Sequence, residues 1–185
     1  MSRLSRIFKT TAAIAVFAAA VSADMNFPTQ NVPWGTLDLR APAGFFTGMK
    51  LAAMRDDPAM CHAALRAGST QFTPVKDETI GECRLENRVL LGKSEHAYSG
   101  AVKANCGLVA ALTVWERQVV APAAEKHLST GVTRIEEAGA FSCRTIRGST
   151  RMSNHSTATA IDITGFRLKN GKTVSVLRDW GKDTK

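Results

Sequence analysis

The chain has 185 residues, of which 44% are apolar and 22% are charged, and its formal net charge is +8. These proportions are typical of a globular protein and exclude wholesale disorder. Only 6 prolines and 14 glycines are present, without periodic spacing, which excludes a collagen-like or proline-rich wall protein. No apolar run reaches the roughly 18 residues that a membrane-spanning helix needs, so we expect no membrane span.

Residues 1–23 have the pattern of a secretory signal peptide. The basic start contains Arg3, Arg6 and Lys9. A short apolar run over 11–20 follows, and residues 21–23 then place small side chains at the cleavage positions. Cleavage before Asp24 would remove three positive charges from the +8 and leave an exported protein of net charge +5. Such a protein first meets anionic wall polymers, so we expect peptidoglycan or another wall polymer as its partner. Nucleic acid is not expected, because no cluster of arginine and lysine interleaved with aromatic residues occurs.

The first half of the mature chain begins irregularly and then becomes regular. Prolines and glycines are scattered through residues 24–50, which predicts an irregular lead-in before a domain over 51–185. Asp57-Pro58 is a typical helix start, and Gly68 ends the apolar stripe that follows. Residues 84–91 then read as one strand that ends at Gly92.

The second half contains the clearest helix and then a cluster of short strands. Apolar residues at three- and four-residue spacing predict a helix over 105–120, and Pro122 either kinks it or starts a second one. Strands are expected over 132–136 and 140–145, followed by a hairpin over 158–177. Helices first and strands last predict an α+β fold, with helices packed on a small, mainly antiparallel sheet.

The apolar residues of the predicted hairpin change register at Gly165. Ile161 and Ile163 occupy odd positions, whereas Phe166 and Leu168 occupy even ones, so a regular strand cannot bury both pairs. A bulge or bend at Gly165 would restore the facing. A three-residue loop over 169–171 would then pair Phe166 with Val174 and place Gly171 in the left-handed conformation.

Four cysteines, Cys61, Cys83, Cys106 and Cys143, remain after export. An oxidising compartment favours disulfides. A zinc knuckle is not indicated, because no two of the cysteines have C-x-x-C spacing. Three pairings are possible. We expect Cys61–Cys83 and Cys106–Cys143, which close the two short sequential loops.

The segment from Arg151 to Phe166 holds the candidate chemistry. His155 and Asp162 would lie about 23 Å apart on one straight strand, so they converge only if the chain folds back near Ser156-Thr157. A carboxylate and an imidazole beside open space would supply two ligands of a catalytic zinc site. A surface ion pair is the alternative explanation of the same two residues.

The order of residues in this segment resembles a known signature. Ser153-x-His155-x-x-Ala158-x-Ala160-x-Asp162 is similar to the S-x-H-x-x-G-x-A-x-D pattern of zinc D-Ala-D-Ala peptidases and their hedgehog-like relatives. The stretch from Cys61 to Trp180, roughly 120 residues, resembles the bacterial extensin-like C-terminal domain family. Further matching elements are Cys106-Gly-Leu-Val-Ala-Ala-Leu, Trp115, Pro122-Ala-Ala, Phe141-Ser-Cys-Arg144 and Ile163-x-Gly-Phe166.

The resemblance implies a bacterial periplasmic or secreted domain with the fold of zinc murein peptidases. His155 and Asp162 would be the first two zinc ligands, and Ser153 would hydrogen-bond near them. Arg144, or less favourably Arg151, would hold a substrate carboxylate or polarise the scissile carbonyl; a solvated surface role is the alternative for both.

Two departures from the family pattern affect these expectations. The family's glycine is Ala158 here, which would crowd the metal or alter the turn. The downstream H-x-H element that supplies the third ligand and base is not present, so we expect a C-terminally shortened domain with little hydrolase activity. His62, His96 and His127 are the other histidines, and each is expected to be structural or at the surface. Two functions stay open: a zinc-dependent peptidoglycan peptidase, and a non-catalytic wall-binding module. The oligomeric state is not predicted.

Overall fold

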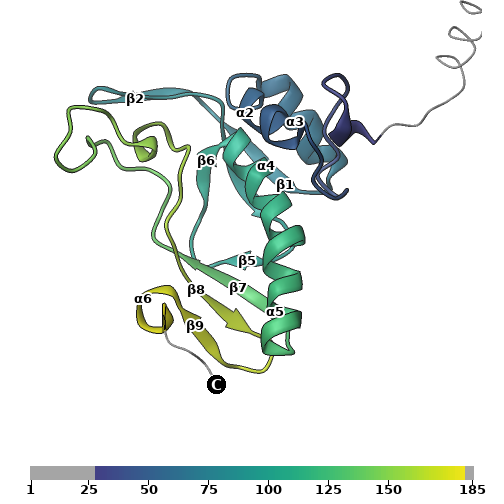
Figure 1. Cartoon of the computed structure of the whole chain (residues 1–185). Coiled ribbons are helices and arrows are strands. Elements are labelled where there is room, and N and C mark those ends of the chain that lie inside the picture. The colour runs from purple at the N-terminus through teal and green to yellow at the C-terminus, as the bar shows by residue number, and fades with distance from the viewer. Residues whose placement is uncertain (1–27, 182–185) are drawn as a thin grey trace, which may run out of the picture.

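The computed structural model describes residues 28–181, which form an α+β fold with helices packed on small, mainly antiparallel sheets, as predicted (Figure 1). The predicted signal peptide lies outside the described residues. The helical elements are η1 Thr29–Asn31, α2 Thr47–Ala53, α3 Pro58–Ala67, α4 Cys106–Trp115, η2 Glu116–Val120, α5 Ala121–Leu128, η3 Asn154–Thr157 and α6 Val176–Asp179. The strands are β1 Gln71–Val75, β2 Glu78–Ile80, β3 Cys83–Leu85, β4 Arg88–Lys93, β5 Ala97–Tyr98, β6 Lys103–Asn105, β7 Val132–Glu137, β8 Ile163–Leu168 and β9 Thr173–Ser175.

The described strands form three sheets. β1, β4 and β6 make an antiparallel sheet with β4 in the centre, and β2 and β3 make a separate hairpin. The third sheet has the order β5-β7-β8-β9, and its β5–β7 pair is parallel. No helix within residues 28–181 is long and apolar enough to cross a bilayer.

A continuous helical rod, made of α4, the π-helical turn η2 and α5, runs along one side of the molecule and joins its two cores (Figure 1). The α4 end packs with α2, α3 and the first sheet in the larger core. The α5 end packs against β7 and β8 in the smaller one. Residues 32–46 form no helix or strand, yet Leu37 and Leu39 are fully buried in the larger core.

The predicted helix starts are present and capped by side chains. Asp57 accepts a hydrogen bond from the Met60 amide at 2.9 Å, and α3 ends at Gly68. Asn105 accepts from the Gly107 amide at 2.9 Å and begins α4. Pro122 lies in the first turn of α5, the second of the two outcomes left open. The π-helical turn before it accommodates a residue that has no amide hydrogen to donate.

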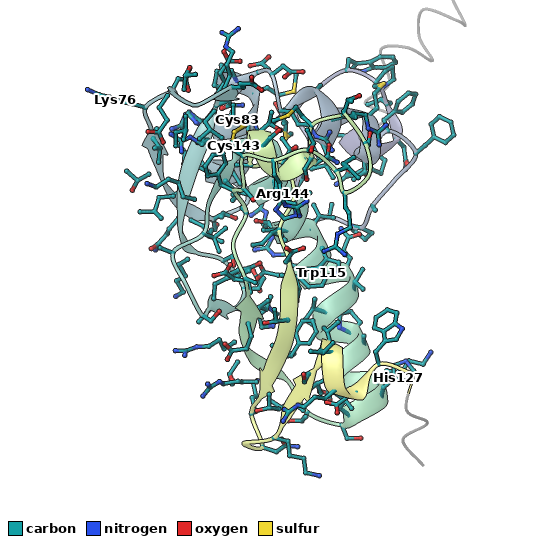
Figure 2. The ribbon with its side chains drawn as sticks, turned by 90° about the vertical axis from the view of Figure 1, so that its left-hand side faces the viewer. Lys76, Cys83, Trp115, His127, Cys143 and Arg144 are labelled. Carbon is teal, nitrogen blue, oxygen red and sulfur yellow. A yellow bond between two sulfur atoms is a disulfide. The ribbon has the colours of Figure 1, made fainter. Side chains whose placement is uncertain are left out.

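The disulfide pairing predicted from loop length is wrong. The structure pairs Cys61 with Cys106 and Cys83 with Cys143, with Cα–Cα distances of 6.1 and 5.8 Å. The first bond joins α3 to α4, which pack side by side in the larger core. The second joins the β2–β3 hairpin to the segment after β7 (Figure 2). Closing any loop lowers the entropy of the unfolded chain and so stabilises the fold. Which cysteines can pair depends instead on which elements pack together and bring two cysteines within bonding distance.

Two of the predicted strands also differ from the structure. Residues 84–91 belong to two strands, β3 and β4, because the chain turns at Asn87, whose φ is +49°. Residues 140–145 are irregular, with a single isolated bridge between Thr145 and Met152. Their backbone bonds elsewhere: the Ser142 amide donates to the His155 carbonyl at 3.0 Å.

The register argument for the last hairpin is confirmed. The β7–β8 pairing slips between Glu136 and Glu137, where Thr164 is the extra residue beside Gly165. Phe166 pairs with Val174, and Gly171 has a φ of +80° at the end of the three-residue loop. Both Ile163 and Phe166 then pack on the smaller core. The predicted strand over 158–162 is absent, because β8 begins at Ile163.

Candidate functional site

His155 and Asp162 come together because the chain folds back between them, in the place that the sequence indicated. Residues Asn154–Thr157 form the 3-10 turn η3, and Ala158 follows in the left-handed conformation with a φ of +53°. The Nε2 atom of His155 and the Oδ1 atom of Asp162 are 3.5 Å apart. The two side chains that the spacing singled out therefore share one site at the surface.

The imidazole of His155 is held in one orientation by its surroundings. Ser153 is buried and caps η3, with its Oγ accepting from the His155 amide at 3.3 Å. Nδ1 of His155 lies 3.2 Å from the carbonyl oxygen of Ala140. This contact fits a tautomer whose proton is on Nδ1, which leaves the Nε2 lone pair free toward Asp162. Sequence patterns carry no signal for Ala140, because it contributes only a backbone carbonyl.

Asp162 is positioned by its backbone rather than by its side chain. Its amide donates to the Gly139 carbonyl at 3.3 Å, and its own carbonyl accepts from the Ala138 amide at 2.9 Å. Its side chain is 65% exposed, against 14% for His155. Among the described residues, none donates a hydrogen bond to the Asp162 carboxylate. The backbone of Asp162 is thus fixed in place, while its carboxylate is left with open coordination.

The separation between the two side chains fits the surface ion pair that is the alternative explanation, and it also fits two ligands of one cation. A nitrogen–oxygen hydrogen bond is normally about 2.7–3.2 Å long, and 3.5 Å exceeds that range. Two ligand atoms bound to one tetrahedral zinc at about 2.0–2.1 Å lie about 3.3 Å apart. The chemistry of the donors also fits, since imidazole nitrogen and carboxylate oxygen both bind zinc.

The described residues supply these two donors and no third. No group of three histidine, cysteine, aspartate or glutamate side chains suited to a metal occurs within residues 28–181. Catalytic zinc sites use three protein ligands. The pair accounts for two of those positions, and we therefore derive no hydrolytic step from it.

Neither candidate arginine contacts the side chain of His155 or of Asp162. Arg144 is exposed and follows Cys143, with its guanidinium 3.4 Å from the neighbouring Thr145 carbonyl (Figure 2). Its backbone carbonyl accepts from the Ser153 amide at 3.0 Å, so it borders the His155 turn. Arg151 is exposed as well, and its contacts are through its backbone.

The other three histidines do not join His155. His127 is exposed near the end of α5, on the opposite side of the molecule from the Cys83–Cys143 disulfide (Figure 2). His96 contacts the buried Glu116 at 3.2 Å. His62 is half-buried on α3, where its ring packs on Phe72. The expectation that they are structural or at the surface agrees with these positions.

A family model described as extensin-like protein C-terminus matches residues 59–185, which is more than half of the chain. The chain belongs to the extensin-like C-terminal family. The matched region contains both disulfides, the His155–Asp162 pair and all of the third sheet. Neither a curated protein nor a solved structure matches the chain.

Within this extensin-like domain, Ala158 occupies the position of the glycine in the pattern noted from the sequence. The structure shows why a glycine suits that position, since a φ of +53° is the left-handed region. Ala158 is fully buried, and its carbonyl accepts from the Asn105 amide at 2.9 Å. The turn therefore forms with alanine, and it ties the His155 segment to the start of α4.

Proposed function

We propose that this extensin-like chain is exported to the bacterial periplasm or beyond, that His155 and Asp162 are two of the ligands of a zinc ion, and that the chain acts on the peptides of peptidoglycan if a third ligand completes the site. The observation that carries the proposal is the 3.5 Å separation of Nε2 and Oδ1, with the opposite ring nitrogen bound to a backbone carbonyl. An imidazole oriented in this way by an outer partner is typical of metal ligands. When bound, zinc would polarise a peptide carbonyl and acidify a coordinated water.

Two further features support an exported location. Both disulfides are of a kind that persists in oxidising compartments. The sequence before Asp24 has the signal-peptide pattern, and the remaining +5 charge favours anionic polymers. Peptidoglycan is the anionic, peptide-bearing polymer that such a protein meets first.

A non-catalytic wall-binding module is the second candidate. It is favoured by the donor set of the described residues, which provides two of the three protein ligands that catalysis by zinc requires. In this case His155 and Asp162 contribute to peptide binding, and no bond is cleaved.

One set of measurements on the full chain tests both candidates. Calorimetric zinc titration, chromatography of digested peptidoglycan and cosedimentation with purified sacculi are compared for the wild type, His155→Ala and Asp162→Asn. His127→Ala is the matched control, because it removes an exposed histidine elsewhere. Zinc binding and peptide release that are both lost in the two site variants support the peptidase. Cosedimentation without release supports the binding module. Absence of zinc binding, release and cosedimentation would overturn the proposal.

A further inference from the structure

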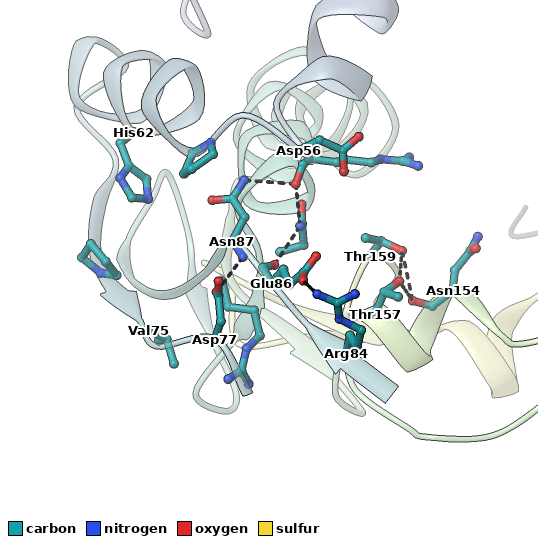
Figure 3. Close-up of a pocket in the computed structure, with 15 residues that line it drawn as sticks. Asp56, His62, Val75, Asp77, Arg84, Glu86, Asn87, Asn154, Thr157 and Thr159 are labelled. Atoms are coloured by element: carbon teal, nitrogen blue, oxygen red, sulfur yellow. Dashed lines mark hydrogen bonds and ion pairs between the residues drawn. The ribbon is translucent and has the colours of Figure 1, made fainter. Parts of the chain in front are cut away.

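A polar cleft of about 690 Å³ borders the turn that carries His155 (Figure 3). One wall comes from the turn between α2 and α3, from α3 itself and from the end of β1. Asn87 and Arg88, at the start of β4, line it as well. The opposite edge is formed by Asn154 and Thr157 of η3, the residues that flank His155 and Ser156. The cleft and the candidate metal pair thus share one short turn.

The buried side-chain atoms that lack a hydrogen-bond partner belong to residues that line this cleft. Within residues 28–181, three buried side-chain atoms have no hydrogen-bond partner: His62 Nε2, Asn87 Oδ1 and Arg88 Nε. All three residues line this cleft. Arg88 is only 4% exposed. Buried polar groups are almost always satisfied, so three exceptions around one cleft point to a polar molecule that completes them.

The other bonds of these residues explain which atoms stay available. The Asn87 amide nitrogen donates to the carbonyls of Met54 and Arg55, which leaves its oxygen toward the side of the cleft on which His62 lies (Figure 3). The Arg88 guanidinium uses one nitrogen for the Lys76 carbonyl and for Glu78, and leaves Nε. Burial, and then Arg66, lower the pKa of His62, so its ring is neutral. The inner cleft therefore offers one acceptor, one charged donor and one neutral imidazole.

Charged side chains of both signs line the cleft. Its lining contains three arginines and three acidic residues, namely Arg55, Arg84, Arg88, Asp56, Asp77 and Glu86. Arg84 pairs with Glu86 at 2.6 Å, and Arg88 pairs with Glu78. Arg55 and Asp56 are adjacent, exposed, and form no ion pair with any described residue. One unused cation beside one unused anion is complementary to a zwitterion.

We propose that this cleft binds the free amino-acid end of a peptidoglycan stem peptide, with the carboxylate of that end on Arg55 and its ammonium on Asp56. The inference rests on the proposed function for the substrate class. The peptide bonds elsewhere in the stem peptide provide both donors and acceptors for Asn87, His62 and Arg88. A peptide held here has its remainder at the turn that carries His155. The cleft is thus a specificity site beside the candidate metal pair.

The test compares two tripeptides that differ in one carboxylate. The diaminopimelate side chain of L-alanyl-γ-D-glutamyl-meso-diaminopimelate ends in one carbon that bears a free ammonium and a free carboxylate, whereas the side chain of the same peptide with L-lysine ends in an ammonium alone. We expect the full wild-type chain to bind the first at least tenfold more tightly by calorimetry. Arg55→Gln should abolish that preference. Asp56→Asn should weaken both peptides by a similar factor. Glu125→Gln and Lys126→Gln, which change an adjacent exposed pair on α5, are the matched controls and should change neither affinity.

A second readout reports on the inner cleft. Nitrogen NMR of the His62 ring should show a shifted Nε2 resonance when the diaminopimelate peptide is added, and no shift with Arg55→Gln at the same concentration. Equal affinities for the two peptides, or a preference that survives Arg55→Gln, would overturn the inference. Because zinc binding and cosedimentation are measured separately, that result would leave the proposed function standing.

Discussion

Two histidine–carboxylate pairs occur within the described residues, and their surroundings differ in kind. Glu116 lies in the π-helical turn, is fully buried, and contacts His96 at 3.2 Å. It also accepts from Ser94 at 2.9 Å, from the His96 amide at 3.0 Å and from Tyr98 at 2.7 Å. Asp162 is 65% exposed and faces a histidine whose other nitrogen is already engaged. The same two chemical groups, an imidazole and a carboxylate, therefore form a pair whose hydrogen bonds are all made in one place and an open ligand pair in the other.

This difference separates stability from binding. A buried carboxylate with several donors cannot take a further ligand without losing one of them, and its removal leaves those donors unpaired. An exposed carboxylate without donors contributes little to folding and is free to bind. Substitutions near Glu116 should therefore lower the free energy of unfolding, whereas substitutions near Asp162 should lower the affinity for zinc.

The largest expected effect comes from the two disulfides, each of which belongs to one of the two regions. Cys61–Cys106 spans 45 residues and joins α3 to the helical rod that carries Glu116. Its replacement by two serines should cost about 4 kcal/mol in free energy of unfolding, because the unfolded chain gains freedom. Zinc affinity should not change. Urea unfolding and zinc titration check this, and a tenfold loss of zinc affinity would contradict it.

Cys83–Cys143 spans 60 residues and holds the segment that contains Ala140. The double serine variant should lose about 4 kcal/mol as well, and it should also weaken zinc binding, because the acceptor of His155 Nδ1 loses its tether. Non-reducing peptide mapping of the wild type must first recover the two crossed pairs. The alternative pairs, Cys61–Cys83 and Cys106–Cys143, would refute the structural assignment.

The next largest effect is the difference in stability loss between substitutions of the two carboxylates, Glu116 and Asp162. Glu116→Gln should lower the free energy of unfolding by about 3 kcal/mol, since it removes a buried acceptor of several hydrogen bonds and mismatches at least one donor. Asp162→Asn should change it by less than about 0.5 kcal/mol, as is usual for an exposed side chain. Zinc titration should give the opposite ranking. If both variants lose stability equally, the distinction between the two pairs is wrong.

Tyr98 gives the His96–Glu116 pair a signature in alkaline solution. Burial, and then the Glu116 carboxylate, raise the pKa of Tyr98 well above its usual value of 10.0. A raised folded-state pKa means that the neutral phenol stabilises the fold below pH 10 and that this contribution is lost as pH rises further. The chain has a single tyrosine, so tyrosinate absorbance reports on this group alone.

Urea unfolding from pH 8 to pH 11 should show a steeper loss of stability for the wild type than for Tyr98→Phe. At pH 8 that variant should be about 1.5–2 kcal/mol less stable, because the hydrogen bond to a charged acceptor is gone. Native-state titration of Tyr98 near its ordinary value would contradict the burial argument.

The sequence predicted those features that depend on local rules. Asp57, Asn105 and Gly171 are caps or turn residues, and the change of register at Gly165 is a period-two argument; all of these are present. The fold-back between His155 and Asp162 was indicated because a straight strand would separate them. These arguments use only neighbours along the chain.

The sequence did not predict features that depend on which elements pack together. The disulfide pairs follow from α3 lying on α4 and from the β2–β3 hairpin reaching the segment after β7. The Ala140 carbonyl and the cleft beside Asn87 are set by backbone positions and long-range contacts. No spacing of side-chain types reports on them.

The smallest expected effect uses a feature that both regions share, a left-handed residue other than glycine at the end of a helix. Ser129 ends α5 with a φ of +50°, and Ala158 ends η3 with a φ of +53°. Left-handed backbone costs an L-residue about 1–2 kcal/mol, and glycine recovers this while adding about 0.5–1 kcal/mol of unfolded-chain freedom. Ser129 is exposed and loses no burial, so Ser129→Gly should stabilise by about 0.5–1 kcal/mol.

Ala158 is fully buried, and deletion of its methyl group costs a further ~0.8 kcal/mol. Ala158→Gly should therefore leave stability within about 0.5 kcal/mol of the wild type, and urea unfolding of the two variants side by side measures the difference. A clear gain at Ala158 equal to that at Ser129 would show that the alanine methyl crowds the His155 turn instead of filling the core.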